Sequence, residues 1–107
     1  MQIAVTILGC GPSIGVPVIG CECWVCKSPK PFNKRLRSSI LLSAQGKNLL
    51  VDFGADFRQQ ILRQNIRQID AVILTHNHAD HVNGIDDLKV FSRLQGQPLN
   101  LYSDIAT

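Results

Sequence analysis

The sequence lacks any apolar stretch near the roughly 20 residues that a membrane-spanning helix needs. Its first residues, Met1 to Val5, include no basic segment and no cleavage motif, so we expect no signal peptide and a cytoplasmic protein. Charged residues make up only 18% of the chain and hydrophobic residues 45%, which excludes a disordered polar chain. The 107 residues therefore indicate one small globular unit.

A strong excess of charge is also missing, because the net charge is only +3. This balance permits an anionic substrate without requiring one, and it is far from the composition of a dedicated nucleic-acid-binding domain. We expect a small phosphate-ester substrate and no membrane partner. A nucleic-acid partner is possible but less favoured.

Histidine is scarce, and the three that occur lie together in Thr75–His81 with Asp80. The apolar run 71–74 precedes this stretch and the amphipathic pattern 82–94 follows it, which predicts a strand that leads into a helix. Alternate side chains share one face of a strand, so His76 and His78 should point the same way, and Asp80 suits the helix start. Such side chains bind zinc, manganese or iron(II), and this interpretation outweighs three unconnected surface histidines.

The four cysteines include three at C-x-C-x-x-C spacing, Cys21, Cys23 and Cys26. Three thiolates this close can converge on one tetrahedral zinc ion, which we favour over free thiols and over a catalytic thiol. A closed zinc site needs a fourth ligand. Cys10 is the remaining cysteine, and every histidine already belongs to the other cluster.

The remaining pattern predicts an α/β fold with a mixed sheet flanked by helices. A basic loop, Lys27 to Arg37, is more typical of solvated chain than of a rim that attracts phosphate. Asp52 ends one of the predicted strands. The expected strands are a buried strand 3–8, a hairpin of strands 38–43 and 48–52, a strand 71–74 and a strand 99–102. The expected helices are 55–65, with Phe57, Ile61 and Leu62 in the core, and 82–94, with Ile85, Leu88, Phe91 and Leu94 buried. The second helix should stop at Gly96.

His76, His78, Asp80 and His81 spell HxHxDH, a signature that resembles the metallo-β-lactamase superfamily. The resemblance implies an αββα sandwich with two catalytic divalent ions, zinc or manganese. His76 and His78 would hold one ion, and Asp80 and His81 the other. A hydroxide between the ions would attack the substrate, and Asp80 could also hold its proton as a catalytic group. Asp52 would orient a metal-binding imidazole by accepting its second N–H.

The run GCGPSIGVPVIGCECWVC, followed by RSSILL, resembles the branch that includes the carbon–phosphorus lyase accessory phosphodiesterase. This resemblance implies a metal-dependent phosphodiesterase acting on a small cyclic or nucleotide-like phosphate, with a structural zinc at Cys21, Cys23 and Cys26. Two alternatives remain. One is a tRNA 3′-processing nuclease of the same superfamily, and the other is a non-catalytic zinc-binding module.

The number of ligands is too small for two complete metal sites. Each ion needs at least three protein ligands, whereas the signature supplies two to each. The resemblance therefore implies that residues 1–107 form the N-terminal half of a single domain and are inactive alone. An apolar sheet face would then be exposed and could support a homodimer.

Overall fold

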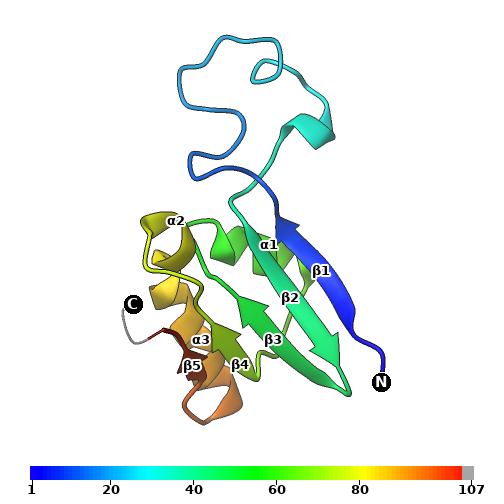
Figure 1. Cartoon of the computed structure of the whole chain (residues 1–107), viewed down its shortest axis with the longest axis vertical. Helices are drawn as coiled ribbons and strands as arrows, with labels where there is room; N and C mark the ends of the chain where they lie inside the picture. The colour runs from blue at the N-terminus through cyan, green and yellow to red at the C-terminus, as the bar shows by residue number, and fades with distance from the viewer. Residues whose placement is uncertain (105–107) are drawn as a thin grey trace.

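Five strands form one mixed sheet in which the spatial order follows the chain order, β1-β2-β3-β4-β5. The computed structural model describes residues 1–104. The first three strands pair antiparallel, whereas β3, β4 and β5 run parallel (Figure 1). The strands are β1 (Ala4–Gly9), β2 (Ser39–Ala44), β3 (Lys47–Val51), β4 (Ala71–Ile73) and β5 (Asn100–Tyr102). The predicted mixed α/β sheet is confirmed.

The β2–β3 hairpin forms where its two-residue turn allows the chain to reverse. Gln45 and Gly46 both have positive φ, 52° and 75°, as the turn that best matches the twist of paired strands requires. The turn sets the register in which Ala44 pairs with Lys47, and Leu41 with Leu50. The predicted hairpin is therefore present, with each strand shifted by one residue.

Two helices cover one face of the sheet, α1 (Phe57–Gln64) and α3 (Ile85–Gln95). Their buried side chains pack with a row of sheet residues, Leu41, Leu50 and Val72, that are adjacent across three strands. As expected, α3 stops at Gly96, which takes φ 70° and donates its N–H to the Ser92 carbonyl. None of the helices within residues 1–104 is long and apolar enough to cross a membrane.

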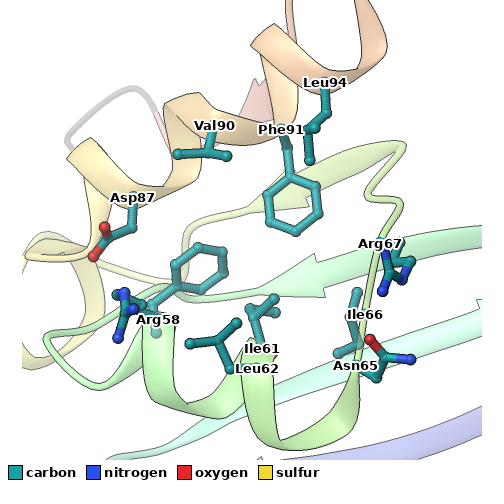
Figure 2. A pocket seen from close by; sticks show the side chains of 11 residues that line it. Arg58, Ile61, Leu62, Asn65, Ile66, Arg67, Asp87, Val90, Phe91 and Leu94 are labelled. Carbon is teal, nitrogen blue, oxygen red and sulfur yellow. The ribbon is translucent and has the colours of Figure 1, made fainter.

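Three apolar helix residues expected in the core are exposed instead: Leu62 (61%), Leu94 (68%) and Ile85 (44%). Phe57 and Ile61, four residues apart in α1, already fill the space beneath that helix. Leu88 and Phe91, three residues apart, do the same beneath α3. Leu62 and Leu94 line an outward-facing groove between the two helices (Figure 2). The apolar periodicity therefore predicted both helices correctly, but it assigned too many of their residues to the core.

The predicted helix 82–94 is interrupted near its start. A short helix, α2 (Ala79–Val82), precedes Asn83 and Gly84, and α3 follows them. Gly84 packs so closely on Gly54 that a Cβ there would overlap the Gly54 carbonyl oxygen and lie 2.7 Å from the Phe57 Cβ. This contact fixes the break between the two helices.

The strand predicted as buried, β1, is instead an edge strand with one uncovered face. Leu8 is fully buried, whereas Val5 and Ile7 are 56% and 57% exposed because they point away from the helices. Ile73 and Tyr102 lie on the same uncovered face, in line with Ile7 across the register. Within residues 1–104, no helix packs on this apolar face.

Residues 10–37, here called the arm, project from the sheet end at which β1 finishes (Figure 1). The arm contains the 3₁₀ helix η1 (Pro31–Asn33) and closes on itself through a bridge between Val16 and Arg35. Arg37 anchors its base, because its guanidinium lies 3.0 and 3.1 Å from the two Asp56 carboxylate oxygens and its N–H donates to the same side chain. Part of the basic loop is therefore not solvated but paired.

Asp70 joins the β2–β3 hairpin to the start of β4. Its carboxylate accepts hydrogen bonds from the Asn48 N–H at 2.7 Å and from Gln68 Nε2 at 2.8 Å. Burial acts to raise the pKa of Asp70, but these hydrogen bonds and the Lys47 charge hold it below its ordinary value. The ionised carboxylate therefore stabilises the fold.

We expect Asp70→Asn to lower the free energy of unfolding at pH 7 by about 1–2 kcal/mol. Because the folded-state pKa is depressed, the advantage of the ionised carboxylate is present above the ordinary Asp pKa and is lost as pH falls through the folded value. Urea unfolding of both proteins at pH 7 and at pH 3 tests this. Asp86→Asn, at an exposed carboxylate on α3, is the matched control, and a difference as large at pH 3 as at pH 7 would contradict the account.

Candidate metal centre

The histidine stretch lies at the sheet edge where the parallel strands β3 and β4 both end. Val51 pairs with Ile73 in register, and the Asp52 N–H donates to the Ile73 carbonyl at 2.9 Å. Asp52 and the loop 74–78 therefore leave the sheet side by side. This edge collects the polar side chains that follow both strands.

The loop brings the three imidazole rings together. The His76 ring centroid lies 4.5 Å from that of His78 and 4.1 Å from that of His81. We expected His76 and His78 to share a strand face, but β4 ends at Ile73 and both residues lie on the loop. His78 adopts extended backbone and precedes α2, and Asp80 occupies the first turn of that helix, as its sequence position indicated.

Asp52 holds the cluster from beneath. It is buried, and its carboxylate accepts hydrogen bonds from the Thr75 N–H at 2.8 Å, the Thr75 hydroxyl at 2.7 Å and His81 Nδ1 at 2.6 Å. Its φ of 67° is a left-handed conformation that a non-glycine residue adopts at some cost in energy. Asp52 therefore fixes both the loop and one of the imidazoles.

The hydrogen-bond directions indicate which nitrogen carries the proton on two of the rings. A carboxylate only accepts, so the single Thr75 hydroxyl proton goes to Asp52. The contact of 2.9 Å between Thr75 Oγ1 and His76 Nδ1 must then use a proton on His76 Nδ1. Likewise His81 Nδ1–H donates to Asp52. When such a ring is neutral, this arrangement places its lone pair on Nε2, the form in which imidazole binds a metal.

His81 lies between two carboxylates. Its Nε2 is 3.0 Å from Asp80 Oδ2, while its Nδ1 faces Asp52. On a neutral ring, the Nε2 lone pair would face another acceptor, so either a proton or a divalent cation must bridge the pair. The side chains of His81 and Asp80 are only 16% and 17% exposed, which favours compensation within the site over solvation by water. This donor set fits a divalent metal.

Thr75 is the contributor that the sequence did not reveal. Its hydroxyl links Asp52 to His76, although Thr75 looks like an ordinary strand-end residue. The only available signal was its place next to the first histidine.

Two glycines let α2, which carries Asp80 and His81, lie against the end of β3. The Phe53 N–H donates to the His81 carbonyl at 2.9 Å, and the Gly84 N–H donates to the Phe53 carbonyl at 2.8 Å. A Cβ on Gly54 would overlap the backbone carbonyl of Asp80. Close approach of backbone at Gly54 therefore sets the position of Asp80 and His81.

We expect Gly54→Ala to destabilise the fold by about 3 kcal/mol and to displace Asp80, because the new methyl group meets backbone that cannot rotate away. Gly96→Ala is the control. It places a methyl group in open space at φ 70°, so it carries only backbone strain of about 1–2 kcal/mol and leaves the site intact. Thermal unfolding and metal content measure both effects. Equal metal content in the two variants would contradict this packing role.

The cysteine trio forms a second cluster in the arm. The sulfur atoms of Cys21, Cys23 and Cys26 lie within 4.8 Å of one another, and within residues 1–104 no other group of three such side chains is this tight. Two backbone N–H groups point at the sulfurs, from Val18 to Cys26 and from Cys26 to Cys23, each at 3.4 Å. Cys10 lies outside the group, where Arg35 Nη1 donates to its sulfur at 3.2 Å. Cys10 therefore does not complete the trio.

The surroundings favour a thiolate at Cys23. The backbone N–H of Cys26 and hydrogen bonds with the Cys21 and Cys26 thiols lower the pKa of Cys23 to about 7. The Val18 N–H acts to lower the pKa of Cys26, but burial and the neighbouring sulfurs raise it overall. A thiolate at Cys23, with two further sulfur atoms beside it, is a ready acceptor for zinc.

Comparison with known families gives one matching family model, described as anti-Pycsar protein Apyc1, over residues 29–104. Among curated proteins, the chain is 51% identical over 84 residues to an octanoyltransferase of Porphyromonas gingivalis, a match covering 78% of this chain and 17% of that protein. It is 36% identical over 112 residues to coenzyme PQQ synthesis protein B of Methylobacterium radiotolerans, a match covering 92% of this chain and 36% of that protein. It is 39% identical over 79 residues to ribonuclease Z of Bradyrhizobium diazoefficiens, a match covering 72% of this chain and 25% of that protein.

Among solved structures, a diphosphatase from the PhnP family superposes with a TM-score of 0.93 at 44% identity, over 98% of this chain and 42% of that one. Zn²⁺-bound PqqB from Methylobacterium extorquens superposes with a TM-score of 0.79 at 32% identity, over 98% and 38%. The chain thus spans well under half the length of each of these relatives. Since the match to the octanoyltransferase covers less than a fifth of that protein, its name says little about these residues.

Proposed function

Because the chain belongs to the family described as anti-Pycsar protein Apyc1, within the metallo-β-lactamase superfamily, we propose that it carries the first metal-binding half of a metal-dependent phosphodiesterase. Its sheet and helices match the N-terminal half of a metallo-β-lactamase fold. The relatives include a diphosphatase and ribonuclease Z, which supports hydrolysis at phosphorus as the reaction class.

The observation that carries the proposal is the orientation of two adjacent imidazoles. With Nδ1 of His76 and of His81 engaged, each ring keeps Nε2 for a metal, and the rings are 4.1 Å apart. In the proposal, His76 and His78 hold one divalent ion, and Asp80 and His81 hold the other. When bound, such ions lower the pKa of coordinated water and stabilise the charge that develops on the attacked phosphate.

Asp52, Asp80 and the cysteine trio each have a further role in this proposal. Asp52 keeps His81 in one tautomer and, through Thr75, does the same for His76. Asp80 also offers a second carboxylate oxygen that can hold a proton during attack. Cys21, Cys23 and Cys26 bind a separate zinc that stiffens the arm. Zn²⁺-bound PqqB supports zinc as one of the metals.

The proposal includes a second half of the domain that supplies the missing metal ligands and covers the apolar sheet face of Val5, Ile7, Ile73 and Tyr102. It favours a small cyclic or nucleotide-like phosphate as substrate. A homodimer is the other arrangement that would cover this face. A tRNA-processing nuclease remains the second candidate function, because ribonuclease Z is among the relatives.

The test is turnover of the full-length protein on a ribose cyclic phosphate, a 2′,3′-cyclic nucleotide and a short tRNA precursor. We expect chelation to abolish hydrolysis, and added zinc or manganese to restore it, because the ligand set has no organic nucleophile to take over. Preference for the cyclic phosphate supports the first candidate, and preference for the precursor RNA supports the second. Chelator-resistant hydrolysis would overturn the metal-dependent proposal.

A further inference from the structure

A basic hollow separates the base of the arm from the sheet. It is an open hollow with a volume of about 190 Å³, lined by the end of β1, the arm and the last turn of α1. Three cationic side chains from these segments, Lys34, Arg35 and Arg63, line it, and no carboxylate does. Three like charges around one hollow repel each other unless an anion joins them.

The cations are oriented by neutral acceptors and not neutralised. Arg63 Nη2 donates to the Leu8 carbonyl at 3.0 Å, Lys34 Nζ donates to the Ser28 carbonyl at 3.3 Å, and Arg35 donates to the Cys10 sulfur. Within residues 1–104, none of the three forms an ion pair. Each guanidinium therefore keeps further N–H donors for a ligand.

An aromatic ring also lines the hollow. Phe32, in η1, lines the hollow and is 62% exposed, although phenylalanine is the most apolar of the aromatic residue types in the chain. Lys30 Nζ lies 5.7 Å from its ring centroid, which adds a further cation on that side. Phosphate-binding cations beside an exposed ring are the arrangement on which nucleotides bind by stacking.

We propose that this hollow binds a nucleotide, with its phosphate at Lys34, Arg35 and Arg63 and its base on Phe32. The hollow lies at the carboxyl end of β1, and the histidines lie at the carboxyl end of β4, at the same edge of the sheet. Three strand spacings of about 4.8 Å separate the ends of β1 and β4 by about 14 Å across the sheet. The nucleotide is either free or one unit of a single strand that continues toward the metal centre.

The experiment measures binding and not turnover, so its result is independent of the proposed hydrolysis. The full-length protein is titrated against a fluorescein-labelled uridine decanucleotide, followed by anisotropy, with uridine monophosphate and inorganic phosphate as competitors. We expect Phe32→Leu to weaken binding by about fivefold or more, and Arg63→Gln and Lys34→Gln each to reduce the salt dependence by about 0.7 in the log–log slope.

Two control variants match these changes in chemistry and exposure. Trp24→Leu removes an aromatic ring of the arm that is 80% exposed but does not line the hollow, and Arg58→Gln removes a cation from the same helix as Arg63. Both should bind like the parent. Competition by the mononucleotide at a similar concentration identifies a free nucleotide as ligand, and competition by the oligonucleotide alone identifies a single strand.

Three results would overturn the proposal. One is equal weakening in the test and control variants, which indicates a general effect of net charge. The second is competition by inorganic phosphate as strong as that by the nucleotide, with no effect of Phe32→Leu. The third is the absence of binding of either nucleotide probe to the parent protein.

Discussion

We expect His78→Ala to reduce kcat/KM for a cyclic phosphate ester by more than about 100-fold in the full-length protein. Loss of a residue that merely orients a metal ligand typically costs about 10–100-fold, so the loss of a direct ligand should exceed that range. His78 is exposed, and its ring contacts that of His76. Its removal should therefore leave the fold intact, which makes activity a direct reading of its role.

Neighbouring substitutions separate metal binding from other effects of changing this loop. Asn77→Ala alters an exposed residue between the two histidines and should retain activity. Asp52→Asn should lower activity by about 10–100-fold and also lower stability, because Asp52 is buried and accepts three hydrogen bonds. Unchanged kcat/KM in His78→Ala would remove His78 from the metal centre.

Replacing Cys23 with serine is expected to release about one zinc per protein and to lower the unfolding free energy by several kcal/mol. The binding energy of a structural zinc contributes directly to folding, so losing a ligand removes much of it. Cys23 is exposed and serine has nearly its shape, so little packing energy is lost. The drop in stability therefore reports on the metal.

Cys10→Ser is the matched control for this prediction. Cys10 is also exposed, but it lies outside the trio and contacts Arg35. Zinc content and thermal stability should both remain at the parent's values. If Cys23→Ser keeps all of its zinc, the trio consists of free thiols, and the arm is held by contacts such as its backbone bridges and the Arg37–Asp56 pair.

Local patterns in the sequence determined the elements whose causes are themselves local. Gln45-Gly46 forms the hairpin turn, and Gly96 ends α3, because each needs only its own backbone freedom. The break at Gly84 could not be predicted, since it arises from contact with Gly54 in another part of the chain. Leu62 and Leu94 were wrongly assigned to the core, because the periodicity of apolar residues does not show how much of each helix surface contacts the sheet.

The candidate site shows the same division. The spacing of His76, His78, Asp80 and His81 was enough to predict that they gather, whereas the expected place of Asp52 near them came from the resemblance to the metallo-β-lactamase superfamily. The part played by Thr75 depends on a buried carboxylate that its own neighbours do not indicate. The basic hollow was also missed, because Arg63 joins Lys34 and Arg35 only after α1 packs beside β1.

Metal content tests the central claim most directly. Elemental analysis of the full-length protein, purified without chelator, is compared with that of His78→Ala and Cys23→Ser. With two catalytic ions and one structural zinc, we predict about three ions in the parent, loss of catalytic metal but retention of zinc in His78→Ala, and the reverse in Cys23→Ser. The same metal content in all three proteins would contradict the claim that these residues form two separate metal centres.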